Sequence, residues 1–211
     1  KQQIFLVTGG VVLLSLLFFF GNTVPKKDKS AVAMPTNVQP SFDIKDYLKQ
    51  TKESLTPAQA TALSGLESGV QSQSNDNDRV KGYEALATYW KDSLHFLDFY
   101  AFYTAEAAKL VNSEKKLTFA AQLMLDALRN DQNAAKRNWK AEQAVALFER
   151  ALKLDPANVD LKIGLASCYV FGKGMTGDAS ETMKGIQQLL QVVREDSNNL
   201  KAQLVLGIGG V

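Results

Sequence analysis

Three glycines have the spacing of a phosphate-binding loop. In the stretch "FGKGMTGDAS", Gly172, Gly174 and Gly177 follow the pattern G-x-G-x-x-G, in which a bare backbone can approach a pyrophosphate. That chemistry also requires a β-strand before the first glycine and a helix after the last one. The residues before Gly172 have a helical pattern instead, so we predict a loop that joins two helices and binds no nucleotide.

We expect this loop to begin where a helix ends. Gly172 and Gly174 are predicted to end that helix in the left-handed conformation, which glycine adopts without steric cost. Under the alternative hypothesis, a nucleotide phosphate would be held by Lys173 and by the N-terminus of the following helix.

Histidine and cysteine are too few in this chain to form a Cys/His metal site or a catalytic pair of either residue type. The chain contains one histidine and one cysteine, so a Cys/His metal site and an internal disulfide are both excluded. His95 stands among aromatic residues without a nucleophile beside it, and we predict a core or boundary position for it. The net charge of +2 is too small to indicate nucleic acid as a partner. We therefore expect a protein that is not an enzyme and has no cofactor, metal or nucleic-acid partner.

An uncharged apolar run opens the chain. Residues 4–20, "IFLVTGGVVLLSLLFFF", contain no charged side chain, and as a helix they would extend roughly 25 Å, at the short end of what spans a bilayer. A cleaved secretory signal is the alternative, but no small-x-small cleavage site follows the run. We expect an uncleaved transmembrane anchor over residues 1–22, which contacts the membrane through residues 4–20.

The orientation of this anchor is predicted less directly. Three lysines follow the run and one precedes it, which favours a cytoplasmic C-terminal side under the positive-inside rule. Anchored proteins with this layout are often periplasmic, and we expect a bacterial inner-membrane protein with a periplasmic body. Residues 23–42, which contain three prolines, are predicted to be an extended tether.

Helical periodicity dominates the rest of the chain, without the alternating pattern of strands. We predict an N-terminal helical segment over residues 43–78, in which Thr56 and Gln59 form a capping box. Two further helices are expected to join near residues 92–93. At "DPAN", Asp155 is predicted to cap a new helix whose first residue is Pro156.

A pattern of small and large residues recurs at fixed spacing in the second half of the chain. Ala144, Phe148 and Ala151 are followed by Pro156 at spacings of 4, 3 and 5, and the same spacings begin again at Gly185. This pattern resembles the second helix and terminal proline of a tetratricopeptide repeat. The residues that match the signature, including those of the intervening first helix, are Ala144, Phe148, Ala151, Pro156, Leu165, Tyr169, Gly185 and Leu189.

The resemblance implies an all-α fold in which antiparallel helix pairs stack into a solenoid. Residues 136–211 resemble such repeats well, with the last one truncated, and residues 79–135 resemble them in a divergent form. Ala144 and Gly185 are 41 residues apart, whereas the family repeats every 34 residues or so. The additional seven residues fall on the glycine stretch. The complete predicted fold class is an N-terminal transmembrane helix, an extended tether and a tetratricopeptide-like α-solenoid.

The resemblance also implies a partner-binding surface. Some members of the family hold a partner's C-terminal carboxylate through Lys and Asn, but the matching positions here are Ile163 and Ser167. We therefore expect the concave face to bind an apolar segment or helix. Aromatic residues near residue 100 could form a second docking patch, with packing between helices as the alternative. The predicted partner-binding residues are Ile163, Ser167, Val170, Trp90, Tyr100 and Tyr103.

The layout resembles ancillary subunits of the protein secretion translocon and other envelope assembly factors. It implies a membrane-anchored adaptor or scaffold that binds protein subunits of a membrane complex. Two alternatives stay open. One is a cytochrome-maturation-type adaptor with similar repeats, and the other is an enzyme whose catalytic domain lies beyond residue 211.

Overall fold

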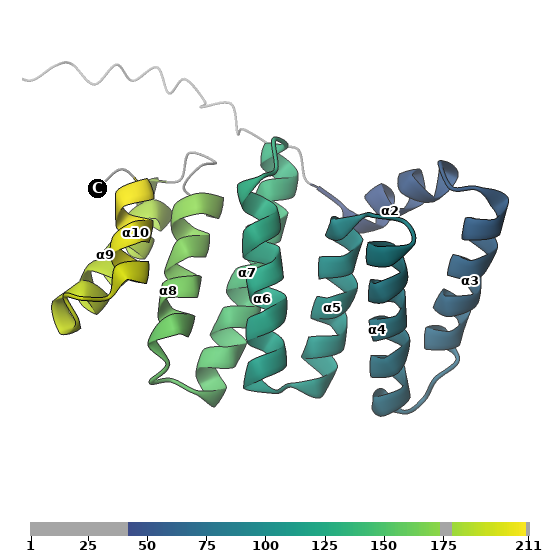
Figure 1. The fold of residues 1–211 in the computed structure, drawn as a ribbon, viewed down its shortest axis with the longest axis horizontal. Helices are drawn as coiled ribbons and strands as arrows, with labels where there is room; N and C mark the ends of the chain where they lie inside the picture. The colour runs from purple at the N-terminus through teal and green to yellow at the C-terminus, as the bar shows by residue number, and fades with distance from the viewer. Residues whose placement is uncertain (1–41, 174–178, 210–211) are drawn as a thin grey trace, which may run out of the picture. The chain divides into compact units, whose positions relative to one another are not determined.

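The helical periodicity of the sequence is realised in a computed structural model that describes residues 42–173 and 179–209. All regular secondary structure in these two stretches is helical, which confirms the all-α part of the predicted fold class and agrees with an α-solenoid (Figure 1). The expected anchor at residues 4–20, nearly all of the tether, and Gly174 and Gly177 lie outside them. No helix within the described stretches combines the length and the apolar character needed to cross a membrane.

Successive helices run antiparallel to each other and stand side by side from α4 onward (Figure 1). The pairs are α4 with α5, α6 with α7, and α8 with α9, and α10 follows as an unpaired helix. The elements are α2 (Ile44–Glu53), α3 (Pro57–Gln71), α4 (Asp76–Asp92), α5 (Leu97–Val111), α6 (Glu114–Arg129), α7 (Ala134–Leu154), α8 (Val159–Cys168), the π-helical turn η1 (Tyr169–Lys173), α9 (Ala179–Glu195) and α10 (Leu200–Ile208).

Local sequence determines where several helices begin. The predicted capping box is confirmed at α3, where Gln59 N donates to Thr56 Oγ1 at 3.3 Å and Thr56 N donates to Gln59 Oε1 at 3.0 Å. Pro57 occupies the first helical position, where its missing N–H is not needed. These bonds satisfy two backbone donors that the helix itself leaves without partners.

The predicted start of a helix at Asp155 is wrong. The backbone N–H of Asp155 donates to Ala151 O at 3.0 Å, so Asp155 closes the last turn of α7. The N-cap of α8 is Asn158, whose side chain accepts from Leu161 N at 3.2 Å. Both residue types are good caps, but residues 156–157 form a turn and α8 begins only at Val159, so Asn158 is the residue directly before the helix. Pro156 therefore lies in the exposed turn between the two helices.

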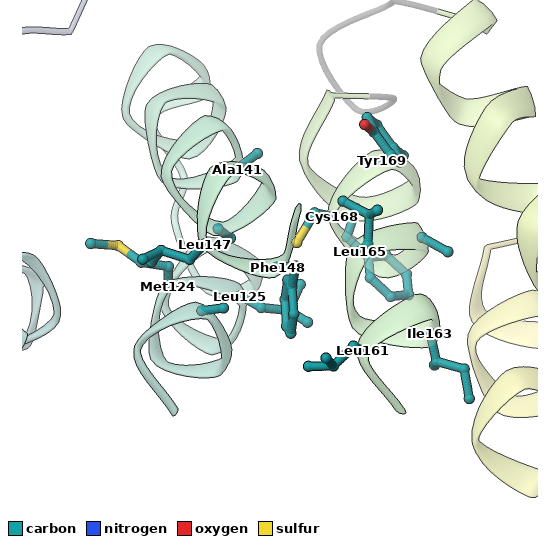
Figure 2. Close-up of a cluster of buried hydrophobic side chains, with 14 of the residues drawn as sticks. Met124, Leu125, Ala141, Leu147, Phe148, Leu161, Ile163, Leu165, Cys168 and Tyr169 are labelled. Atoms are coloured by element: carbon teal, nitrogen blue, oxygen red, sulfur yellow. The ribbon is translucent and has the colours of Figure 1, made fainter. Parts of the chain in front are cut away.

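The repeat signature forms the core between the helix pairs (Figure 2). Phe148 is 1% exposed and extends from α7 toward α8, where the bare Cα of Gly164 leaves space for its ring. Gly185 likewise allows α9 to approach α8 closely, because a Cβ there would come within 2.7 Å of Ala166 O on α8. The buried members of the signature are Ala144, Phe148, Ala151, Leu165, Tyr169, Gly185 and Leu189.

Gly172 does not end a helix in the left-handed conformation, and that prediction is wrong. The chain continues from α8 into η1, and Gly172 lies inside this π-helical turn with no left-handed φ. A Cβ on Gly172 would overlap the Cβ of Ala141 on α7. The glycine is thus explained by close approach of η1 to α7, and part of the long repeat unit is used to extend its first helix.

A second hydrophobic cluster joins α2, α3, α4 and α5. Trp90 and Phe99 are fully buried at its centre, with ring centroids 4.3 Å apart, and Tyr47 of α2 stacks on Phe99 at 4.9 Å. His95 is exposed in the turn between α4 and α5 and has φ of 62°. Our prediction of a core or boundary position for His95 is wrong, because the chain reverses direction there and its side chain leaves the aromatic cluster.

Candidate protein-binding groove

The first helices of three successive units, α6, α8 and α10, together line a groove with a volume of about 700 Å³. They lie next to one another because each is linked to the next by a helix that runs back along the second layer. The apolar side chains of the lining are Phe119, Leu125, Phe148, Ile163, Leu204 and Val205.

Two of the apolar side chains that line the groove are exposed to solvent. Phe119 of α6 is 49% exposed and Leu204 of α10 is 62% exposed, whereas Ile163 of α8 is only 5% exposed between them. An exposed apolar surface inside a concave feature is typical of a binding site, because a ligand can remove it from water.

Polar groups surround this apolar lining. Lys201 Nζ lies 2.8 Å from Asp160 Oδ1, which links the first turns of α10 and α8. At the other end of α6, the guanidinium of Arg129 lies 4.5 Å from the centre of the Phe171 ring. A groove with an apolar floor and polar edges can orient a peptide segment while it buries apolar side chains.

The structure brings only two of the six predicted partner-binding residues into the groove. Ile163 and Ser167 line it, although Ser167 Oγ donates to Ile163 O at 2.8 Å and so has its hydrogen bond inside α8. Val170 is buried in η1, and its neighbours include Gly185 of α9.

The other three predicted residues belong to the second hydrophobic cluster. Trp90 and Tyr103 are buried in it, 0% and 6% exposed, and Tyr100 is partly exposed beside it. Sequence reasoning did not name Phe119 or Leu204. A signal for Phe119 exists, because it lies outside the apolar stripe of α6 formed by residues such as Leu117, Ala120, Ala121 and Met124.

The single cysteine, Cys168, is buried at the end of α8. Burial raises the pKa of the Cys168 thiol, so the thiol stays protonated and is a poor nucleophile. Within the two described stretches, no three His, Cys, Asp or Glu side chains are placed to hold a metal ion. The element before Gly172 is a helix, so the context that a phosphate-binding loop needs is missing there.

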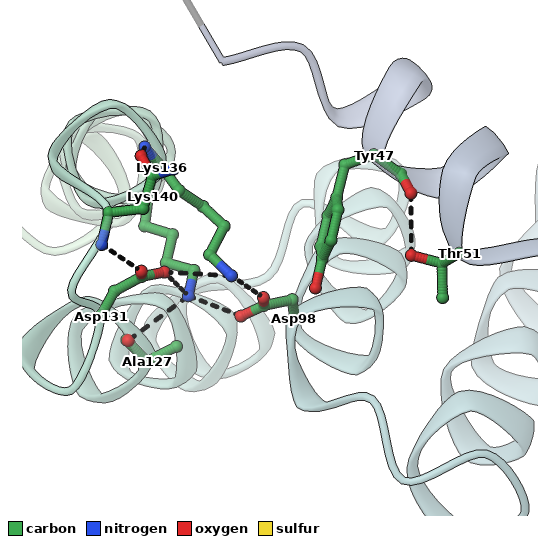
Figure 3. A network of polar contacts seen from close by, with 8 residues as sticks. Tyr47, Thr51, Asp98, Ala127, Asp131, Lys136 and Lys140 are labelled. Carbon is green, nitrogen blue, oxygen red and sulfur yellow. Dashed lines mark hydrogen bonds and ion pairs between the residues drawn. The ribbon is translucent and has the colours of Figure 1, made fainter. Parts of the chain in front are cut away.

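A pocket of about 420 Å³ between α5, α6 and α7 contains a different kind of candidate site, a cluster of charges (Figure 3). Lys140 is 3% exposed, and its Nζ lies 2.5 Å from Asp98 Oδ1 and 2.7 Å from Asp131 Oδ2. Lys136 Nζ lies 2.7 Å from Asp98 Oδ2 and 4.8 Å from the centre of the Tyr47 ring on α2. The cluster thereby ties α2, α5 and α7 to the end of α6.

The charges of this cluster neutralise one another. Burial by itself would raise the pKa of Asp98, but hydrogen bonds from Lys136 and Lys140 outweigh it and lower the pKa. At Asp131 burial is likewise outweighed, by Lys140 and by the backbone N–H of Asn133, and the pKa is lowered. Two carboxylates and two ammonium groups, each paired, leave little for a ligand to bind, and we interpret the cluster as structural.

These pKa shifts predict acid sensitivity. Because Asp98 and Asp131 have lower pKa values in the folded than in the unfolded chain, their contribution is complete above the unfolded value of about 4. The free energy of unfolding should fall as the pH drops from about 5 through the folded pKa values, as urea unfolding at a series of pH values would measure. Asp131→Asn should flatten this dependence, and the exposed control Asp92→Asn should not; equal slopes in both variants would contradict the assignment.

Residues 140–204, which extend from α7 into α10, match the model of the tetratricopeptide repeat family. Neither curated proteins nor solved structures match the chain. The matched residues and the helical fold support a tetratricopeptide repeat protein, and such repeats are typically non-catalytic modules that bind other proteins. The looser similarity over residues 79–135 lies before the matched residues and stays a prediction.

Proposed function

We propose that this protein is an adaptor that binds partner proteins in the groove between α6, α8 and α10. The observation that carries the proposal is the concave apolar surface on which Phe119 and Leu204 are about half or more exposed. The occupant that fits is an extended segment or a helix with an apolar face, since burial of that face provides the favourable free energy.

We further propose that residues 4–20 anchor this adaptor in a bacterial inner membrane, with the helical body in the periplasm. The support for it is the sequence alone, an apolar run without a charged residue that is followed by a proline-containing tether. Such an anchor would confine the groove to the membrane surface and raise the local concentration of partners there. The partners we propose are subunits of an envelope complex such as the secretion translocon.

Capture from detergent extracts tests the groove. The change Phe119→Asp should reduce the amount of bound partner at least tenfold, equivalent to ~1.4 kcal/mol, because it replaces exposed apolar area of the groove lining with a charge. Mass spectrometry of proteins that co-purify with the full chain, from native membranes and after gentle detergent extraction, provides the measurement. Met183→Asp is the matched control, since Met183 is 52% exposed on α9 outside the groove.

Different outcomes address different parts of the proposal. Capture of equal amounts of partner by wild type and by Phe119→Asp would contradict the proposal that the groove is the binding surface. Recovery of the protein without detergent would contradict the proposed membrane anchor, but it would not affect the proposal that the groove binds partner proteins. Cytochrome-maturation proteins among the captured partners would replace the translocon with the alternative complex.

A further inference from the structure

A recess lies between α7, α8 and α9, and we call it the first recess. It forms because α7 and α9 both pack against α8 but have little contact with each other. At about 100° per residue, Lys162 and Leu165 in its lining lie on the opposite face of α8 from Ile163 and Ser167 in the groove. Another helix, α10, follows α9, so the first recess lies within the array of helices.

The first recess has an apolar floor. Leu165 of α8 and Val192 of α9 are buried there, and Leu152 and Pro156 complete its apolar lining. Its volume of about 350 Å³ is at the lower end of the range for ligand sites. A space of this size suits one large apolar side chain rather than a helix.

The side-chain amide of Gln188 on α9 also lines the first recess and is not committed to another contact. Its Oε1 is buried and has no hydrogen-bond partner among the residues that the structure describes. A buried acceptor without a donor costs free energy, and rotation about the last bond of the side chain can turn the amide toward a ligand. An extended peptide can supply the missing donor, because a backbone N–H group accompanies each of its side chains.

Acidic side chains border the first recess. A second recess of about 320 Å³ shares Val192 and Glu195 with the first one and also contains Asp160 and Asp196. Asp160 is paired with Lys201. Glu195 and Asp196 form no ion pair within the described part of the chain.

Neutral donors hold these two unpaired carboxylates in place. Gln191 Nε2 donates to Glu195 Oε1 at 3.0 Å, and the backbone N–H of Asn198 donates to Asp196 Oδ1 at 3.0 Å. Their negative charges are therefore not compensated. Lys162 is a basic residue in the lining of the first recess, but acidic side chains predominate around the two recesses together. A basic side chain of a ligand would complement this charge.

We propose that the two recesses bind an extended segment of a partner protein in which a large apolar residue is flanked by Arg or Lys. The apolar side chain occupies the first recess over Leu165, and the backbone N–H beside it donates to Gln188. The basic side chain lies against Glu195 and Asp196. This surface is separate from the groove of the proposed function, and Asp160 is the one lining residue that they share.

A short peptide tests the proposal directly. The probe is the fluorescein-labelled peptide Gly-Ser-Arg-Leu-Arg-Ser-Gly, and fluorescence anisotropy during titration with the detergent-solubilised full chain should show saturable binding. A probe with Gly in place of Leu should bind roughly tenfold more weakly, because it has no side chain for the first recess. Gln191→Trp should weaken binding by a similar factor, since Gln191 is exposed at the first recess and an indole there would fill it. Glu195→Lys should weaken binding severalfold, because it places a positive charge against the arginines of the probe.

Matched controls accompany these variants. Glu53 and Glu195 are both exposed glutamates at the last position of a helix, so Glu53→Lys should bind the probe as wild type does. Circular dichroism should show that Gln191→Trp and Glu195→Lys keep the thermal midpoint of wild type. Phe119→Asp should keep probe binding even when partner capture in the groove is lost, so failure of one proposal is distinguishable from failure of the other.

Several outcomes would overturn the proposal. They are the absence of saturable binding, equal binding of the Leu and Gly probes by wild type, and equal binding of the Leu probe by wild type and by either recess variant. The comparison of the two probes uses wild type alone and does not depend on how a variant folds. The chain also has a basic segment of its own, with Lys26, Lys27 and Lys29 close to Val24. Tighter probe binding by the triple variant Lys26→Glu, Lys27→Glu, Lys29→Glu would assign the recesses to that segment and overturn the proposal of a partner protein.

Discussion

Replacement of Lys140 by Met should destabilise the protein by roughly 3 kcal/mol, in the range found when one partner of a buried ion pair is removed. Lys140 is 3% exposed and its ammonium group contacts both Asp98 and Asp131. Met has a similar length and keeps the packing of the side-chain stem, so the loss reports the charge. After the change, two largely buried carboxylates share the single ammonium group of Lys136.

Urea unfolding followed by circular dichroism measures this effect, with Lys81→Met as the matched control. Lys81 forms an ion pair with Asp78 at 3.0 Å, but its side chain is 76% exposed, and its loss should change stability by no more than about 0.5 kcal/mol. Adding Asp131→Asn to Lys140→Met should recover part of the loss, because it removes a carboxylate left without sufficient positive charge. A loss below about 1 kcal/mol in Lys140→Met would contradict a structural role for the cluster.

The second large effect is expected in the core of the repeat. Phe148→Ala should destabilise the protein by roughly 3–5 kcal/mol, because it removes a buried aromatic side chain and leaves a cavity. Phe148 lies in the core between α7 and α8 (Figure 2), where it is 1% exposed. Its ring lies against Gly164, which has no side chain that could fill the space. The two sides of this cavity are α7 and α8, so the change weakens the contact between successive repeat units.

Phe119→Ala is the matched control for this prediction. The same side chain is removed, but Phe119 is 49% exposed at the groove, and we expect a loss of about 1 kcal/mol or less. Urea unfolding of both variants provides the comparison. Losses of equal size would mean that Phe148 is not a core residue of the repeat or that Phe119 is not free to bind a partner.

Local features of this protein could be predicted from the sequence because they depend on neighbours within one turn or one helix. The capping box at Thr56 and Gln59 needs only residues three positions apart. The apolar period of helix after helix predicts the all-α class, and the spacing of small and large residues from Ala144 onward predicts which side chains are buried between the units.

Where the sequence offered two local interpretations, the structure was needed to distinguish them. Asp155 and Asn158 are both suitable caps, but in the structure Asp155 ends α7 and Asn158 stands directly before α8. Gly172 has the spacing of a phosphate-binding loop, but its bare Cα is explained by Ala141 of α7, 31 residues earlier in the sequence. No local pattern contains that contact.

The candidate site depends most on tertiary structure. The groove joins Phe119, Ile163 and Leu204, which come from three helices and meet only when alternate helices stack in register. The ion pairs of Asp98 with Lys136 and Lys140 likewise join helices that are far apart in sequence. Periodicity shows which face of a helix is apolar, but the amount of that face left open depends on the helix packed beside it, and only the three-dimensional arrangement decides this.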